Sequence, residues 1–143
     1  MSTKPSLYTS LERASADHEI LDLYIRCYNR ILSRASPSAL RDATEGMRLF
    51  LRKKVVEHFA FEERTVFPAL LDAFPDEAVA DLVSELRDDH KRLLREAERL
   101  DKALTDETAA YNRVSLLRKG LREFFHSMEK HAVKESELIP SLI

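Results

Sequence analysis

Apolar residues recur at steps of three and four residues along most of this chain, which is the spacing of one buried face on an α-helix. Four segments show the pattern and predict helices over residues 10–34, 37–73, 76–104 and 108–137. Proline marks two of the breaks, at Ser36–Pro37 and Phe74–Pro75, because it is favoured in the first turn of a helix. At the third break, near Thr105–Thr108, capping side chains are present but no glycine or proline marks one residue.

Short connections between four long helices favour one architecture. They predict an all-α fold, an up-down-up-down antiparallel four-helix bundle. A chain of 143 residues fits a single domain, which we expect to span residues 1–143. The composition agrees, because leucine, glutamate and arginine are common while only two glycines and five prolines occur.

Charge and composition exclude several classes of protein. Charged residues make up 34% of the chain, yet the net charge is only −2, so no basic surface for nucleic acid or an anionic membrane is expected. Cys27 is the single cysteine, which excludes an internal disulfide and a zinc site of paired cysteines. Without a long apolar run or a secretory signal, the chain is expected to be cytoplasmic. We expect it to be a monomer or a homodimer.

Polar residues occupy six positions on the faces that are expected to be buried. They are His18, His58, Glu62, His90, His131 and Glu135. Burying an ionised carboxylate is costly unless it is paired or binds a metal, so ordinary packing does not explain the two glutamates. Each glutamate follows a histidine by four residues, about one helical turn, so the two side chains of each pair point the same way.

The spacing of the histidines places them at one level of an antiparallel bundle. Midpoints between successive histidines fall at residue 38, at residue 74, and between residues 110 and 111. The first two coincide with the predicted proline breaks, and the third lies just after the third break. All four imidazoles are therefore expected in one layer of the core, with both carboxylates about one turn away. We predict a metal site in that layer.

The two halves of the chain repeat this pattern. His18 recurs as His90, 72 residues later, and an aspartate precedes both. The phrase that begins at His58 recurs at His131, 73 residues later, each time with a glutamate four residues on. A repeated helical hairpin predicts a pseudo-twofold site, and four imidazoles with two carboxylates suit two metal ions better than one. These ligand types suit iron, manganese or zinc.

This pattern resembles the hemerythrin-like, or HHE cation-binding, domain family over roughly residues 10–142. Two His-x-x-x-Glu phrases with two spaced single histidines are a specific signal. The resemblance implies a non-haem centre of two iron ions, bridged by both glutamates and an oxygen species. It also implies that His18 and His58 serve one iron, and that His90 and His131 serve the other.

The pattern departs from that of the oxygen-carrying hemerythrins, which have a further histidine one turn from the ligand on the third helix. Here the positions one turn either side of His90 are Leu86 and Leu94, and the step to the last carboxylate is four residues instead of five. Both metals are therefore expected to have open coordination positions. The ligand set looks closer to relatives implicated in the response to nitric oxide and in iron–sulfur repair.

Three functions are compatible with these residues. The first is a di-iron protein that engages oxygen, nitric oxide or a related molecule such as peroxide, for sensing, carriage or stress response. The second is a di-iron redox enzyme or iron donor in nitrosative or oxidative stress and iron–sulfur cluster repair. No acid or base beyond the ligands stands out, so the residues leave open whether the protein is an enzyme. The third is a structural metal site in an interaction module.

Two polar residues close to these motifs are expected to lie outside the site. His126 precedes His131 by five residues, which places it about 140° around the helix, among charged residues. Glu63 follows Glu62 directly and therefore points away from the apolar face. Both are predicted to be solvated.

Overall fold

The computed structural model of the protein describes residues 6–34, 37–105 and 114–142. These residues form helices with short connections, and no strand occurs among them, so the all-α prediction is confirmed. The elements are α1 (Leu7–Arg34), α2 (Pro37–Leu49), η1 (Phe50–Lys54), α3 (Val55–Phe61), η2 (Glu62–Val66), α4 (Phe67–Ala73), α5 (Glu77–Thr105) and α6 (Val114–Leu142). Along the described helices, no segment is long and apolar enough to cross a membrane.

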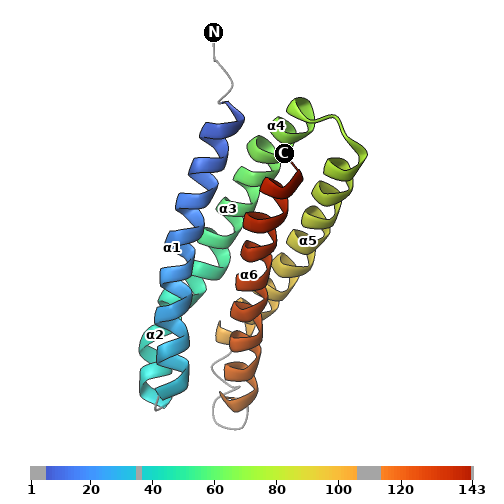
Figure 1. Cartoon of the computed structure of the whole chain (residues 1–143). Helices are drawn as coiled ribbons and strands as arrows, with labels where there is room; N and C mark the ends of the chain where they lie inside the picture. The colour runs from blue at the N-terminus through green and yellow to red at the C-terminus, as the bar shows by residue number, and fades with distance from the viewer. Residues whose placement is uncertain (1–5, 35–36, 106–113, 143) are drawn as a thin grey trace.

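The elements α2 to α4 form one continuous helix. η1 and η2 are five-residue π-helical segments, and the residues that join them to their neighbours keep right-handed helical dihedrals. Val55, for example, follows η1 with φ −65° and ψ −46°. The described residues therefore contain four long helices. In Figure 1, α1 leads away from the N-terminus, the helix from α2 to α4 lies beside it, and α6 lies next to α5. α6 contacts both α1 and α5.

The ends of the outer helices differ from the sequence-based bounds. α1 begins at Leu7, three residues before the predicted start, and α6 continues to Leu142, five residues past the predicted end. α6 passes through Pro140, which has no N–H to donate to the carbonyl of Ser136, so the helix continues there with one hydrogen bond fewer. Ile139 is buried there at 6% exposure, which favours keeping the turn helical. The predicted start of the fourth helix, residue 108, lies outside the described residues.

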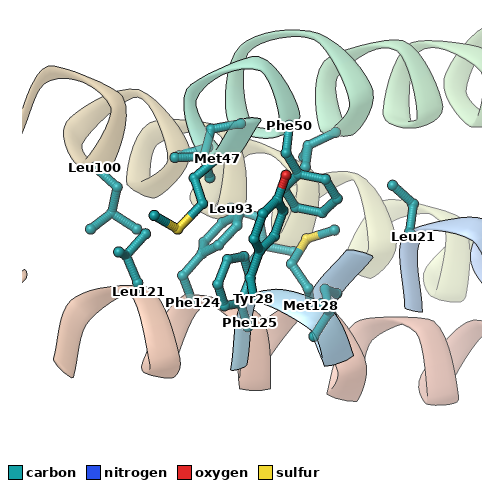
Figure 2. Packing of buried hydrophobic residues seen from close by; sticks show 14 of the residues in the cluster. Leu21, Tyr28, Met47, Phe50, Leu93, Leu100, Leu121, Phe124, Phe125 and Met128 are labelled. Atoms are coloured by element: carbon teal, nitrogen blue, oxygen red, sulfur yellow. The ribbon is translucent and has the colours of Figure 1, made fainter. Parts of the chain in front are cut away.

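Two apolar clusters fill the interior, one on each side of the polar layer. The larger one contains aromatic, leucine and methionine side chains (Figure 2), among them Tyr28, Met47, Phe50, Leu93, Leu121, Phe124, Phe125 and Met128. The smaller one contains Ala14, Val66, Phe67, Leu70, Val79, Leu82, Val83, Leu86 and Ile139. On α5, His90 lies between Leu86 of the smaller cluster and Leu93 of the larger one. The polar layer is thus enclosed by apolar packing along the bundle.

η2 accounts for an irregularity in the internal repeat. Pro68 follows Glu62 by six residues, whereas Pro140 follows Glu135 by five, so the first half carries one residue more. η2 spans Glu62–Val66, inside that interval. A π-helical turn accommodates one additional residue without ending the helix. The residues after the insertion therefore return to the core, where Val66 and Phe67 are buried.

Candidate metal centre

The helices bring the six predicted residues into one layer. His18 lies on α1, His58 on α3, Glu62 at the start of η2, His90 on α5, and His131 and Glu135 on α6. Five of them are at most 5% exposed, and the His18 side chain is 18% exposed. Such burial of two carboxylates and three imidazoles is unusual for polar side chains and requires partners for them.

Within this layer the side chains form two groups that share both glutamates. The first group is His18, His58, Glu62 and Glu135, and the second is Glu62, His90, His131 and Glu135. In each group one candidate ligand atom per residue lies within 4.8 Å of the others. The location bounded by the first group is named position 1, and that bounded by the second group is named position 2. Two imidazoles and two carboxylates surround each position.

Glu62 contacts histidines of both positions. Its Oε1 atom lies 3.2 Å from Nε2 of His58 and 3.3 Å from Nε2 of His90. His58 belongs to the same continuous helix, one turn earlier, whereas His90 comes from α5. A single carboxylate oxygen is thus directed between an imidazole of position 1 and an imidazole of position 2.

Glu135 completes the link between the positions through both of its oxygens. Oε2 lies 3.1 Å from Nε2 of His18, and Oε1 lies 2.6 Å from Nε2 of His131. His131 precedes Glu135 by one turn on α6, while His18 reaches it from α1. The two oxygens therefore face different positions, which is the geometry a bridging carboxylate needs.

The nitrogen and oxygen atoms of the layer are better placed to bind a cation than to form hydrogen bonds with one another. The Nε2 atoms of His90 and His131 lie 3.0 Å apart, within hydrogen-bond distance, so two ring nitrogens converge on one point. Nε2 of His58, Oε1 of Glu62 and both oxygens of Glu135 are buried without a hydrogen-bond partner, although they lie within ion-pair distance of other members of the layer. Buried polar atoms without partners are costly. A bound metal ion would satisfy these atoms, because iron, manganese and zinc accept nitrogen and oxygen ligands.

Protons occupy the layer when no metal is bound. Burial alone would lower the pKa of His18, but its contacts with Glu135 and Glu62 outweigh burial and raise this pKa to about 10. The pKa of His90 is raised in the same way to about 9. Burial would raise the pKa of Glu62, but its contacts with Glu135 and three histidines hold this pKa well below its usual range. A metal that binds at neutral pH must therefore displace protons.

Three acidic residues outside the six lie against the other ring nitrogens of the histidines. Asp89 accepts a hydrogen bond of 3.2 Å from Nδ1 of His131. An oxygen of Asp17 lies 3.5 Å from Nδ1 of His58, and an oxygen of Glu63 lies 3.6 Å from Nδ1 of His90. Only the contact of Asp89 is a hydrogen bond, and a partner of this kind fixes the orientation of a metal-binding imidazole. None of the three was predicted to belong to the site, although an aspartate precedes each of the two single histidines, His18 and His90.

Two expectations about neighbouring polar residues have different outcomes. His126 is exposed on α6, as predicted. Glu63 is not fully solvated, since its side chain is 37% exposed and faces the ring of His90. The prediction failed because Glu63 lies in η2, where the π-helical turn changes the direction of side chains relative to a regular α-helix.

Aromatic rings enclose His90. Phe59 stacks on the imidazole with ring centroids 4.0 Å apart and an interplanar angle of 11°. Phe67 stacks at 5.5 Å and 22°. Leu86, one turn before His90, is completely buried, and Leu94, one turn after it, packs against the larger apolar cluster. These apolar side chains supply no further ligand and keep water from position 2.

Position 1 lies beside a small cavity lined by α1, α3 and α6. The cavity has a volume of about 30 Å³, which exceeds the roughly 10–15 Å³ that a water molecule needs. Its lining consists of His18, Leu21, Asp22, Ile25, His58, Phe59, Met128, Glu129, His131 and Ala132. A small molecule in this cavity would lie next to three of the candidate ligands.

Comparison with known families agrees with this geometry. A family model described as the hemerythrin HHE cation binding domain matches residues 9–142, almost the whole chain. Comparisons with curated proteins and with solved structures found no match. The matched region includes every histidine and glutamate of the two groups. The chain therefore belongs to the hemerythrin family of HHE cation-binding domains.

Proposed function

We propose that this protein binds two iron ions, one at each position, and engages oxygen, nitric oxide or a related small molecule at an open coordination position. One observation carries the proposal: two groups of two histidines each share Glu62 and Glu135 in a single buried layer. Bound iron would supply redox chemistry and Lewis acidity. Cation binding by the family, with iron as the metal it implies, supports this choice of metal.

The surrounding residues favour a small, uncharged ligand. The cavity beside position 1 has room for a molecule of the size of water, and apolar side chains such as Leu21, Ile25 and Met128 form much of its wall. With two imidazoles and two shared carboxylates, each metal would have fewer than six protein ligands.

We also infer the up-down-up-down antiparallel order of the bundle, which the paths of the helices in Figure 1 support.

The test begins with metal-free protein loaded anaerobically with Fe²⁺, followed by measurement of bound iron and optical spectra. We expect two iron ions per chain and a spectral change on adding oxygen or nitric oxide. A stable, reversible adduct would support sensing or carriage. Continuous consumption of the added molecule, or loss of iron, would support the redox-enzyme or iron-donor function instead. If the metal-free protein failed to bind Fe²⁺ but bound Zn²⁺, both of these functions would be contradicted and a structural metal site would be favoured.

Matched variants connect this result to the six residues. His58→Ala should lose the metal of position 1, and His131→Ala that of position 2, because each removes one of two imidazoles. His126→Ala is the control, since this histidine is exposed on α6 and should leave the iron content unchanged. Full iron content in both ligand variants would refute the assignment of the site.

A further inference from the structure

The two positions have the same types of candidate ligand, but they differ in the residues that contact those ligands. At position 2, Asp89 accepts a hydrogen bond from Nδ1 of His131 and also one from Lys134 Nζ at 3.1 Å. Lys134 makes a second ion pair with Glu85 on α5. The carboxylate of Asp89 is only 16% exposed, so water screens these contacts weakly. Lysine and histidine from α6 thus hold one oxygen of an α5 aspartate.

Position 1 lacks this arrangement. Asp17 takes the place of Asp89, but its oxygen is 3.5 Å from Nδ1 of His58, and that nitrogen has no hydrogen-bond partner. The Asp17 side chain is 33% exposed, and among the described residues no lysine or arginine forms an ion pair with it. The imidazole of His58 is therefore less firmly oriented than that of His131.

The internal repeat shows where the difference comes from. Lys134 follows His131 by three residues, and the residue three after His58 is Phe61. The guanidinium of Arg13 lies over the Phe61 ring, 4.0 Å from its centroid, instead of pairing with Asp17 one turn away on α1. A lysine in one half and an aromatic residue in the other break the twofold symmetry of the site.

Orientation of the imidazole affects metal affinity. A histidine that donates Nδ1–H to a carboxylate has its Nε2 lone pair fixed toward the metal and is a more basic ligand, so less order must be imposed on binding. At position 2 the neighbouring His90 is also completely buried and stacked between Phe59 and Phe67. At position 1 the His18 side chain is 18% exposed. Position 2 is the better prepared of the two.

We propose that Asp89 and Lys134 are positioning residues for His131, and that they make position 2 the tighter metal site, which fills first. This inference rests on the proposed two-metal centre. Its structural basis is the chain of contacts from Glu85 through Lys134 and Asp89 to His131, which links α5 to α6. The protein would accordingly retain one metal under conditions in which it releases the other.

The experiment is a titration of metal-free protein with Co²⁺, followed by visible absorption. We expect two steps, of which His131→Gln removes the tighter and His58→Gln the weaker. Lys134→Met and Asp89→Asn should weaken the tighter step by about 10- to 100-fold, the usual effect of losing such a partner, and should leave the weaker step unchanged. Lys134→Arg should restore the tighter step, because it keeps the charge.

Two controls separate positioning from general stability. Lys102 forms an exposed ion pair with Glu98, 3.2 Å away on the same helix α5. Lys102→Met removes this lysine and should change neither step. In Zn²⁺-loaded protein, ¹⁵N NMR should find the His131 ring protonated at Nδ1, and Asp89→Asn should increase exchange of this proton. A loss of stability alone would not change that signal selectively.

The outcomes distinguish this inference from the function on which it rests. Two equal steps in the unchanged protein, or equal weakening of both steps by Lys134→Met, would overturn the positioning role while leaving the two-metal centre intact. Weakening of the tighter step by Asp17→Asn as strongly as by Asp89→Asn would also overturn it. Binding of a single metal would contradict the two-metal function itself, and with it the ranking of the positions.

Discussion

Glu135 shows how one residue governs the whole site, because its two oxygens face histidines of different positions. We expect Glu135→Gln to lower metal affinity at both positions, whereas loss of a histidine affects one. In the metal-free variant the pKa of His18 should fall from about 10, because burial, which lowers it, would then be opposed mainly by Glu62. NMR titration of the imidazole checks this, and an unchanged pKa would contradict the contact.

The same contacts determine how the metal-free protein responds to pH. The folded pKa values of His18 and His90 are about 10 and about 9, above the ordinary 6.5, so their contribution to stability is complete below pH 6.5. It is lost as the pH rises through 9 and 10. The pKa values of Glu62 and Glu135 lie below the ordinary 4.5, so their contribution is present above pH 4.5 and is lost on acidification.

Urea unfolding of metal-free protein should therefore give a higher free energy of unfolding near pH 6 than near pH 10. Metal affinity should change in the opposite sense over this range, rising with pH as protons cease to compete for His18 and His90. Exposed His126 serves as the reference, and its substitution should not alter either profile. A metal-free protein that is more stable at pH 10 than at pH 6 would show that the layer is not held by these ion pairs.

At the scale of the elements, η2 predicts which deletion the protein tolerates. Deletion of exposed Arg64 removes the additional residue of the first half and should turn η2 into regular α-helix, with Phe67 and Leu70 still facing the core. Deletion of exposed Glu137 is the matched change in α6, which is regular α-helix there and has no additional residue to lose. It would rotate Ile139 by about 100° away from the core.

Thermal unfolding and metal content distinguish these two deletions. The Glu137 deletion should cost about 2–5 kcal/mol, the range for losing a large buried aliphatic side chain, and the Arg64 deletion much less. The Arg64 variant should also keep its metals, since His58 and Glu62 precede the deletion on the same helix. An Arg64 deletion as damaging as the Glu137 deletion would mean that η2 has a role of its own.

For the molecule as a whole, we expect the two apolar clusters to keep the bundle folded without metal, and bound metal to add to that stability. A ligand at 100 times its dissociation constant stabilises the folded state by about 2.7 kcal/mol per site. Chelation should therefore lower the midpoint of thermal unfolding while the helical circular dichroism at room temperature is retained. Loss of helix on chelation would show that the clusters alone are insufficient.

Packing within the larger cluster provides the complementary test. Phe125 is completely buried and contacts Tyr28 and Phe50 as aromatic rings (Figure 2). Phe125→Leu should lower the free energy of unfolding by about 1–3 kcal/mol through the lost ring contacts and the small cavity left behind. Metal stoichiometry in the folded variant should stay the same, because the cluster lies outside the ligand layer. A selective loss of metal there would contradict this separation.

The helices and the polar residues of the layer could be predicted without any knowledge of the fold. Helical periodicity depends on local spacing, so the apolar stripes could be found without knowing their partners. The six polar residues were found for the same reason, since each lies on such a stripe. The common position of the four histidines along the bundle followed from their separations in the sequence, because a helix rises by a constant amount per residue.

Features that depend on contacts between helices could not be predicted from local sequence patterns. The hydrogen bond from His131 to Asp89, the approach of Lys134 and the stacking of His90 join residues from different helices, so no local pattern specified them. The turn of Glu63 toward His90 depended on η2, which periodicity of a regular helix does not describe. Sequence thus predicted the six polar residues that the fold brings into one layer, and packing between helices produced the difference between the two halves of that layer.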